Sequence, residues 1–265
     1  MDWFMGKGKK KEKDGLNERE QPPYLESDWA TQKLIDVNMK NFVYRPEGID
    51  VNEWLATHTI HFFEHVNVFY GLVAEYCTPT DCPSMTGPSN MNYQWVDDKS
   101  KKNKCSAPQY VEYVMTSIQR TITDETLFPT KYGQPFPQTF DTIIRRLFRL
   151  LFHVLAHIYA AHFQHVAQFG MHSHLNTLFL HLMSFDKLFK IVDEKETDIL
   201  TELYIKLQGD RRPSSNEDNQ SQSPNNSQSF QEDTKNSEVS KVPKSTADST
   251  DTNTLAVQSQ NMCQN

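Results

Sequence analysis

The spacing of apolar residues is the strongest constraint on how this chain folds. After residues 50–53, apolar side chains recur at steps of three and four as far as residue 76, which places them on one face of a helix. This face comprises Val51, Leu55, Phe62, Val66, Phe69, Val73 and Tyr76. Asp50 and Glu53 have the spacing of a capping box, which satisfies free N–H groups at a helix start. The pattern predicts one long helix with a single buried stripe.

The same reasoning predicts further helices downstream. A second helix begins at Ser106, a third covers residues 139–163, a fourth follows Ser173, and a short last helix stops at Gly209, because glycine commonly ends helices. Prolines within residues 127–140 predict a loop between the second and third helices. Long helices with few strand signals predict an all-α fold, a four-helix bundle with additional short helices and loops.

Polar tails flank this helical core. Residues 209–265 are rich in Ser, Asn, Gln and Thr, and such a segment cannot bury enough apolar surface to offset its ordering entropy. We therefore predict a disordered tail there and a flexible segment over residues 1–25, with a helical domain at 26–208. The tails account for a hydrophobic fraction of only 37%.

Composition and motifs exclude several classes of function. The net charge of −7 disfavours general binding to nucleic acid, which requires a basic face. The longest apolar stretch, residues 147–163, contains an arginine and three histidines, so we expect no integral membrane segment. No signal peptide is recognisable, and we expect a protein of the cytoplasm and nucleus. Hydrolase, protease and nucleotide-binding motifs are missing, so we predict no enzymatic activity.

Cysteines and histidines predict a metal site. Cys77 and Cys82 are close enough to bind one ion, and four histidines follow on one predicted helix. These are His153, His157, His162 and His165. Two cysteines and two histidines form a closed zinc site without an open position for catalysis. His153 and His157 share a helix face, whereas His157 and His162 lie roughly 140° apart on an ideal helix. The second pair requires the helix to distort or end nearby, and spacing alone selects neither pair.

Six segments of the chain resemble the Mob family of kinase co-activators. The resemblance runs in order over roughly residues 35–207. The segments are PEGIDVNEW (46–54), FFEHVNVFYG (62–71), KCSAPQYVEYVM (104–115), DETLFPTKYGQPFP (124–137), AHIYAAHF (156–163) and HLNTLF (174–179). The resemblance implies an all-α fold with a four-helix bundle and one structural Zn²⁺, held by Cys77, Cys82, His157 and His162. His153 and His165 are then not ligands.

The resemblance also implies a surface that binds the N-terminal regulatory segment of an NDR, tricornered or Lats-type kinase. The matching residues are Glu53, Trp54, Thr57, His61, His65, Val68, Phe69, Phe128, Pro129, Lys131 and His181. Carboxylates at 47, 50 and 53 favour a basic partner, and Trp54 offers a large anchor. In the alternative interpretation Trp54, Val68 and Phe69 are core residues and the carboxylates are helix caps.

Two departures from the family pattern favour its second branch, which partners NDR/tricornered kinases. Ile49 and His61 stand where many members carry acidic residues. A basic phosphopeptide-binding cluster of some relatives is reduced here to Arg149 and His153, so we predict weak or absent phosphopeptide binding.

The resemblance thus implies a non-catalytic regulatory subunit for an NDR/tricornered-type Ser/Thr kinase, in cell morphogenesis, polarity and Hippo-like signalling. We expect a monomer before it binds the kinase. Either activation or competitive restraint is compatible with the sequence. The alternative is a phosphoprotein-binding signalling scaffold that does not activate a kinase directly.

Overall fold

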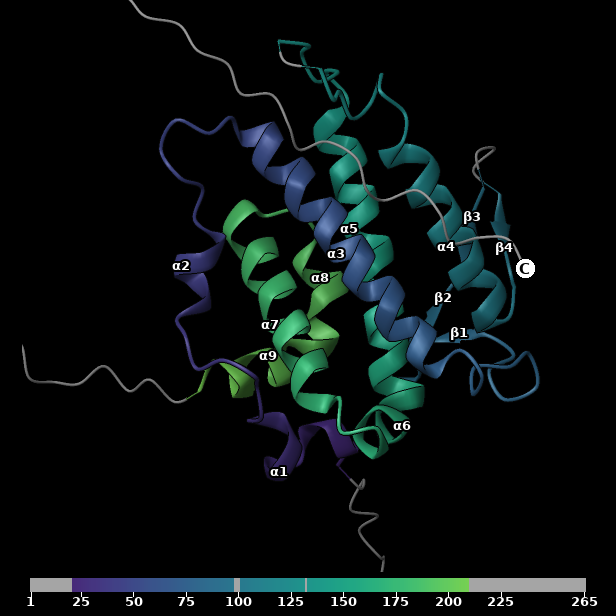
Figure 1. The fold of residues 1–265 in the computed structure, drawn as a ribbon. Helices are drawn as coiled ribbons and strands as arrows, with labels where there is room; N and C mark the ends of the chain where they lie inside the picture. Colours follow the sequence, from purple (N-terminus) through teal and green to yellow (C-terminus); the bar gives the residue numbers. More distant parts are fainter. Residues whose placement is uncertain (1–20, 98–100, 132, 210–265) are drawn as a thin grey trace, which may run out of the picture. The chain divides into compact units, whose positions relative to one another are not determined.

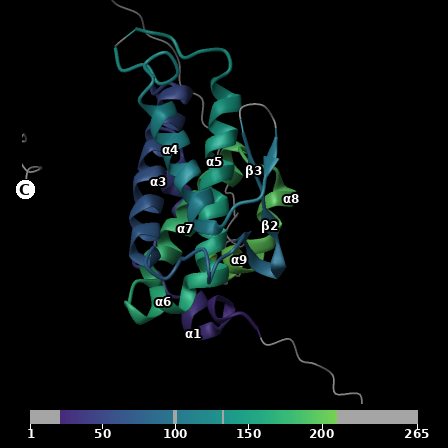
Figure 2. The same ribbon diagram turned by 90° about the vertical axis from the view of Figure 1, so that its right-hand side faces the viewer.

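Four long helices form the core of the protein, as predicted. The computed structural model describes residues 21–97, 101–131 and 133–209. The long helices are α3 (Val51–Val73), α4 (Ala107–Ile122), α5 (Phe140–His157) and α7 (His172–Phe189). Figures 1 and 2 show α3 lying along α5, with α4 and α7 beside this pair, and α3 contacts all three of the others. The all-α prediction with a four-helix core is confirmed.

Shorter elements surround these helices. They are the helices α1 (Ser27–Ala30), α2 (Met39–Val43), α6 (Phe163–Gln168), α8 (Glu194–Thr197) and α9 (Thr201–Gln208), three 3₁₀ turns (Pro23–Leu25, Pro88–Asn90 and Asp198–Leu200) and a π-helical turn (Ile158–His162). Two short antiparallel hairpins between α3 and α4 were not predicted. They pair β1 (Met85–Thr86) with β2 (Asn92–Tyr93), and β3 (Trp95–Val96) with β4 (Lys102–Asn103).

Local signals set the helix ends largely as expected. The Asp50 carboxylate accepts hydrogen bonds from the N–H groups of Asn52 (2.8 Å) and Glu53 (3.3 Å). At the other end of the domain, Gly209 follows α9 with a φ of +75°, a conformation that favours glycine. The predicted buried stripe of α3 is wrong at its two ends, where Val51 is 41% exposed and Tyr76 is 42% exposed. Val51 opens the first turn, and Tyr76 lies beyond the last helical residue, where the periodicity no longer applies.

An aromatic cluster joins α3, α5 and α7 in the core. The ring of Phe148 lies 5.6 Å from Phe62, edge to face, and 5.6 Å from Phe185, stacked. All three side chains are buried. Aromatic pairs at such distances add to the stabilisation from area burial. This cluster packs α3 and α7 against α5.

Part of the segment predicted as flexible belongs to the core. Tyr24 and Leu25 are buried, and the Tyr24 ring packs edge-on against Tyr159 at 5.6 Å and Phe163 at 6.1 Å. Apolar burial of Tyr24 and Leu25 therefore attaches this part of the segment to the core. The remaining predictions for the tails, over residues 1–20 and 210–265, lie outside the described residues.

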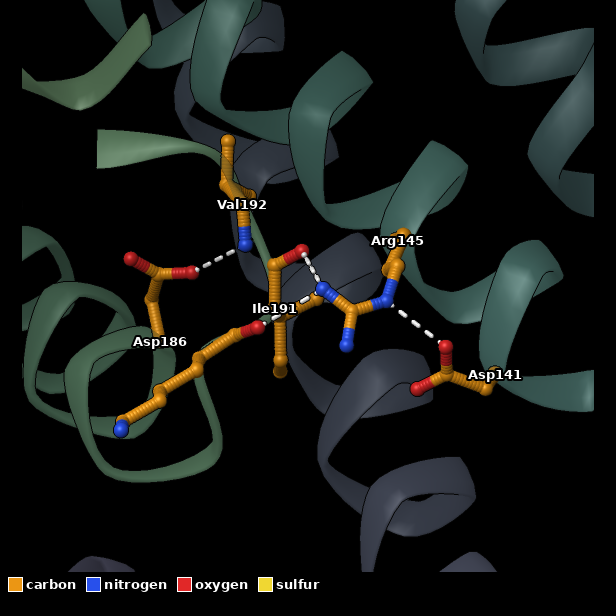
Figure 3. Close-up of polar contacts among 6 residues, drawn as sticks. Asp141, Arg145, Asp186, Ile191 and Val192 are labelled. Atoms are coloured by element: carbon orange, nitrogen blue, oxygen red, sulfur yellow. Dashed lines mark hydrogen bonds and ion pairs between the residues drawn. The ribbon is translucent and has the colours of Figure 1, made fainter. Parts of the chain in front are cut away.

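A polar clamp attaches the loop after α7 to α5 (Figure 3). Nη1 of Arg145 donates to the carbonyl oxygens of Lys190 (2.8 Å) and Ile191 (2.9 Å), and its Nε donates to Asp141 (2.7 Å). On the other side of the loop, the Asp186 carboxylate accepts from the N–H of Val192 at 2.7 Å. These bonds determine where the chain enters α8.

No helix in the described part of the chain has the length and apolarity to cross a membrane.

Candidate metal centre and partner-binding surface

Backbone hydrogen bonds position both cysteines just after α3. The Cys77 N–H donates to the carbonyl oxygens of Val73 (3.1 Å) and Ala74 (3.2 Å), which continues the last turn of the helix. The Cys82 N–H donates to Thr78 at 2.8 Å, and its carbonyl accepts from Ala107 at the start of α4. Both side chains are buried. The loop thus holds two thiols rigidly beside the end of α5.

A change of helix type brings the two histidines together. α5 ends at His157, and residues Ile158–His162 form a π-helical turn before α6 begins. Hydrogen bonds of the i→i+5 type in such a turn bring residues five apart onto one side of the helix. His157 and His162 therefore face the same site, and the predicted distortion of the helix is confirmed.

The four side chains converge on one buried point. Cys77 Sγ lies 3.5 Å from His157 Nε2, and Cys82 Sγ lies 3.5 Å from His162 Nε2. All four candidate ligand atoms lie within 4.8 Å of one another. His157 Nδ1 lies 2.8 Å from the Thr86 carbonyl, so an N–H there donates to it and Nε2 is left free toward the cysteines. This group is able to hold a metal ion.

Burial keeps these groups uncharged when no cation is bound. Desolvation raises the pKa of Cys77 to about 12, despite a hydrogen bond from Tyr70. Desolvation, together with the neighbouring imidazoles, lowers the pKa of His162 to about 4. A neutral, buried thiol is a poor nucleophile. The arrangement is therefore suited to metal binding and unsuited to cysteine-based catalysis.

The other two histidines of the predicted cluster are not part of this group. His153 Nδ1 lies 2.8 Å from the Tyr110 hydroxyl, and the Tyr93 ring stacks on the imidazole at 3.9 Å. His165 stacks on Tyr76 at 4.2 Å. The closely spaced metal-binding group contains neither of them.

Five of the predicted partner-binding residues form an exposed stripe on α3. They recur mostly at steps of four, and Val68 is 70% exposed. The residues of this stripe are Glu53, Thr57, His61, His65 and Val68. We refer to them as the α3 stripe. They are accessible together along nearly the whole helix.

Other predicted partner-binding residues are partly or fully covered. Phe69 and Phe128 are only 7% and 4% exposed, because Phe69 lies on the core side of α3 and Phe128 packs on Phe140 at 5.2 Å. The structure thus places Phe69 in the core, as the alternative interpretation has it. Trp54 is half-buried, and its Nε1–H donates to the Val43 carbonyl at 3.2 Å. Pro129 is half-buried, whereas Lys131 is exposed and lies 3.8 Å from Glu125.

His181 on α7 lies beneath the α3 stripe. Its ring contacts Phe62 (4.7 Å) and His58 (5.7 Å), and its Nε2 is buried without a hydrogen-bond partner among the described residues. Burial and the nearby imidazoles of His58, His65 and His61 lower the pKa of His181 to about 4. Sequence reasoning missed His58, although its spacing between Leu55 and Phe62 is that of a core position.

Arg149 and His153 face a half-buried carboxylate, and this contact was not predicted. Arg149 Nη1 lies 3.6 Å from Oε1 of Glu196, and His153 Nε2 lies 3.6 Å from Oε2. Glu196 belongs to α8, which lies far along the chain from α5. No spacing pattern in the sequence connects these two segments.

Comparisons with known proteins agree with this architecture. The chain matches the Mob1/phocein family over residues 31–200. It is similar to MOB kinase activator 2 of Homo sapiens, with 46% identity over 206 residues, 77% of this chain and 86% of the human protein. It is also similar to MOB kinase activator-like 2 of Drosophila melanogaster, with 45% identity over 205 residues, 77% of this chain. The match spans only 36% of that fly protein.

Proposed function

This chain belongs to the Mob1/phocein family, and we propose that it is a non-catalytic regulatory subunit of an NDR/tricornered-type Ser/Thr protein kinase. Family membership and relatives named kinase activators support a role in kinase regulation. In our proposal the chain binds the basic N-terminal regulatory segment of the kinase as a monomer, in the cytoplasm and nucleus. Its output is cell morphogenesis, polarity and Hippo-like signalling.

The observation that carries this proposal is the α3 stripe with its acidic start. Glu47, Asp50 and Glu53 are exposed around the first turn of α3, and they form no ion pair with any residue that the structure describes. Exposed carboxylates without an ion-pair partner attract and orient a basic partner. Trp54, half-buried beside them, is a suitable anchor for an apolar side chain of that partner.

We propose that the metal is zinc and that its role is structural. With Zn–S of about 2.3 Å and Zn–N of about 2.0–2.1 Å, tetrahedral ligands place sulfur and nitrogen about 3.5 Å apart. The two Sγ–Nε2 distances in the structure are 3.5 Å. Cys77 and Cys82 would lose their protons on binding the ion, and His157 would keep its Nδ1–H on Thr86. Such a centre ties the loop after α3 to the end of α5.

Regulation would follow from binding alone. A kinase segment that becomes ordered on the α3 stripe shifts the kinase toward whichever conformation presents that segment better. The sign of the effect depends on that differential affinity. The alternative function, a phosphoprotein-binding scaffold, needs an accessible cationic site, and Arg149 and His153 face Glu196 instead.

Calorimetric titration of the full-length chain with the basic N-terminal segment of an NDR-type kinase tests the proposal. We expect tight binding by the wild type and at least tenfold weaker binding by Glu53→Lys and Trp54→Ala. Glu112→Lys makes the same charge change at an exposed position of α4 and should bind like the wild type. No binding by a folded, metal-loaded wild type would refute the proposal.

A further inference from the structure

A groove lies between α2 and the helices α7 and α9. It consists of two adjoining cavities of about 310 and 240 Å³, whose linings share Lys40 and Ser184. In Figure 1, α2 lies to the left of α7 and α3 lies to its right. No residue of the α3 stripe and no candidate metal ligand lines either cavity. The groove is therefore a surface separate from the two sites described above.

The lining of this groove is cationic, although the chain is acidic as a whole. Three lysines line the two cavities, and no acidic residue that the structure describes lines either of them. The lysines are Lys33, Lys40 and Lys187. Because the chain carries a net charge of −7, three cations without a lining carboxylate depart strongly from its average. Charge complementarity therefore favours an anionic occupant.

The ammonium groups of these lysines are only partly engaged. Lys40 is exposed and forms no ion pair with any residue that the structure describes. Lys187 has one ion pair, at 3.6 Å, with the exposed side chain of Glu194. Lys33 pairs with the exposed Asp36 at 3.2 Å and donates to a carbonyl of α9 at 3.1 Å. Exposed ion pairs contribute little stability, so an incoming carboxylate can replace Glu194 at Lys187.

Two buried hydroxyl groups with poor partners lie in the lining. Ser184, which lines both cavities, is 3% exposed, and Tyr204, which lines the smaller one, is 8% exposed. Their oxygens lie 3.5 Å apart, whereas O–H···O hydrogen bonds are typically about 2.7–2.8 Å long. Among the described residues neither hydroxyl has a shorter hydrogen bond. Both are therefore available to an acceptor that enters the groove.

Apolar side chains line the groove between these polar groups. Val37 and Leu180 line the larger cavity, and Val43 and Leu188 line the smaller one. The ring of Tyr44 also lines the smaller cavity and is largely exposed to solvent. An inorganic anion would leave this apolar surface uncovered. The groove therefore fits a ligand that carries carboxylates and apolar side chains together, as an acidic peptide does.

We propose that this groove binds an acidic, extended peptide segment of a partner protein. Carboxylates of that segment pair with Lys40 and Lys187. Acceptor oxygens receive hydrogen bonds from the hydroxyls of Ser184 and Tyr204, and apolar side chains pack on Leu188. A peptide side chain reaches the two buried hydroxyls, whereas a flat lipid surface does not. The occupant is opposite in charge to the kinase segment proposed for the α3 stripe, so the two surfaces bind different ligands.

The test measures peptide binding to the full-length protein by fluorescence anisotropy. The probe is a labelled pool of nonapeptides with four glutamates and five apolar residues in random order, and a matched pool carries glutamine for glutamate. We expect the wild type to bind the glutamate pool at least tenfold more tightly than the glutamine pool. Lys40→Glu should weaken this binding at least tenfold. Lys104→Glu makes the same change at an exposed position outside the groove and should bind like the wild type.

A second variant tests the buried part of the site. Tyr204→Phe removes one hydroxyl and keeps the ring, and it should weaken binding of the glutamate pool at least threefold. Metal content and melting temperature establish that each variant is folded. Equal affinity of the wild type for the two pools would overturn the proposal, and so would equal affinity of wild type and Lys40→Glu for the glutamate pool.

Two further measurements distinguish other occupants and the proposed function. Sedimentation with phosphatidylserine vesicles and light scattering detect a membrane or a second copy of the chain as the occupant. Vesicle binding or self-association that Lys40→Glu removes, in a wild type that does not bind the glutamate pool, would overturn the proposal. Calorimetric titration with the basic kinase segment should not be weakened by Lys40→Glu. Failure of the proposed function and failure of this inference are therefore distinguishable.

Discussion

At the scale of the residue, the candidate metal centre is built from four side chains on segments far apart in the chain. Cys77 and Cys82 lie in a loop with no regular secondary structure, and their Sγ atoms lie beside Nε2 of His157 at the end of α5 and Nε2 of His162 in the π-helical turn. Metal binding to such a site stabilises the folded state only, because the unfolded chain does not hold the ligands together. If the four side chains bind a metal as proposed, removing one of them should lower both metal content and stability.

We expect Cys77→Ser to lose the bound metal and to lower the melting temperature by at least about 10 °C, since each kcal/mol shifts a domain of this size by roughly 2–4 °C. Cys105→Ser is the matched control, because Cys105 is half-buried and lies outside the metal-binding group. Elemental analysis and calorimetry would measure both quantities. Full metal content in Cys77→Ser would exclude Cys77 as a ligand.

His181 should make the protein sensitive to acid. Burial and neighbouring imidazoles lower its pKa to about 4, whereas an unfolded histidine titrates near about 6.5. The unfolded state therefore binds more protons between these values, and stability should fall as the pH drops from 6.5 toward 4. Above the unfolded pKa this contribution is fully present.

The expected result is a flatter pH dependence in His181→Phe. The free energy of unfolding, measured by denaturant titration from pH 7 to 4.5, should fall less in this variant than in the wild type. His58, His153 and His157 also have a pKa lowered by burial, so part of the dependence remains. His174→Gln, on the same helix and not among the groups that lower the pKa of His181, is the control. Identical slopes in His181→Phe and wild type would contradict the assignment.

At the scale of the element, specific polar contacts stabilise segments that are too short to form a stable helix alone. α8 has four residues and cannot be stable alone. Asp193 caps it by accepting from the Lys195 N–H, and the Arg145 clamp fixes the preceding loop. The π-helical turn is also short, and its role is to direct the side chain of His162 toward the candidate metal centre.

Arg145→Ala should lower the melting temperature by about 3–12 °C. It leaves the carbonyl groups of Lys190 and Ile191 without their donor, and a lost bond to a charged group costs about 1.5–3 kcal/mol. Arg146→Ala removes the adjacent arginine, which has one long contact with Ser117, and should change the melting temperature by less than about 2 °C. Equal effects of the two substitutions in calorimetry would show that the clamp does not stabilise the loop.

At the scale of the whole molecule, charge and exposure distinguish two faces of the helical domain. The α3 stripe begins among carboxylates that form no ion pair with any described residue, whereas two adjoining cavities along α5 are lined by basic, acidic and aromatic residues. The chain as a whole carries a net charge of −7. Long-range attraction of a basic kinase segment would therefore act mainly at α3, and that attraction is screened by salt.

Raising the salt concentration should weaken kinase-segment binding, mainly through slower association. We expect the association rate to fall by at least tenfold between 50 and 500 mM NaCl, on the scale typical of electrostatic steering. Glu53→Lys should show a smaller dependence, because one attracting carboxylate is replaced by a cation. Stopped-flow fluorescence would measure both rates. A salt-independent rate would indicate that apolar contacts dominate.

Local interactions explain what could be predicted from the sequence alone. The periodicity of residues 51–73, the Asp50 cap and Gly209 at the end of α9 depend on neighbours within a few residues. The set of cysteines and histidines could also be recognised, and resemblance to a family selected the pair His157 and His162. Their spacing allowed them to share one ion only if the helix was distorted.

Tertiary structure decided the rest, because it depends on contacts between segments far apart in the chain. Packing buries the side chains of Phe69 and Phe128 in the core, although both residues were expected in the partner-binding surface. Folding also brought Glu196 of α8 between Arg149 and His153 of α5. Helical periodicity specifies which face of a helix is buried, but it does not specify which other segment covers that face. The sequence by itself therefore determined the helices and the metal-binding residue types, and the three-dimensional packing determined which side chains remain available to a partner.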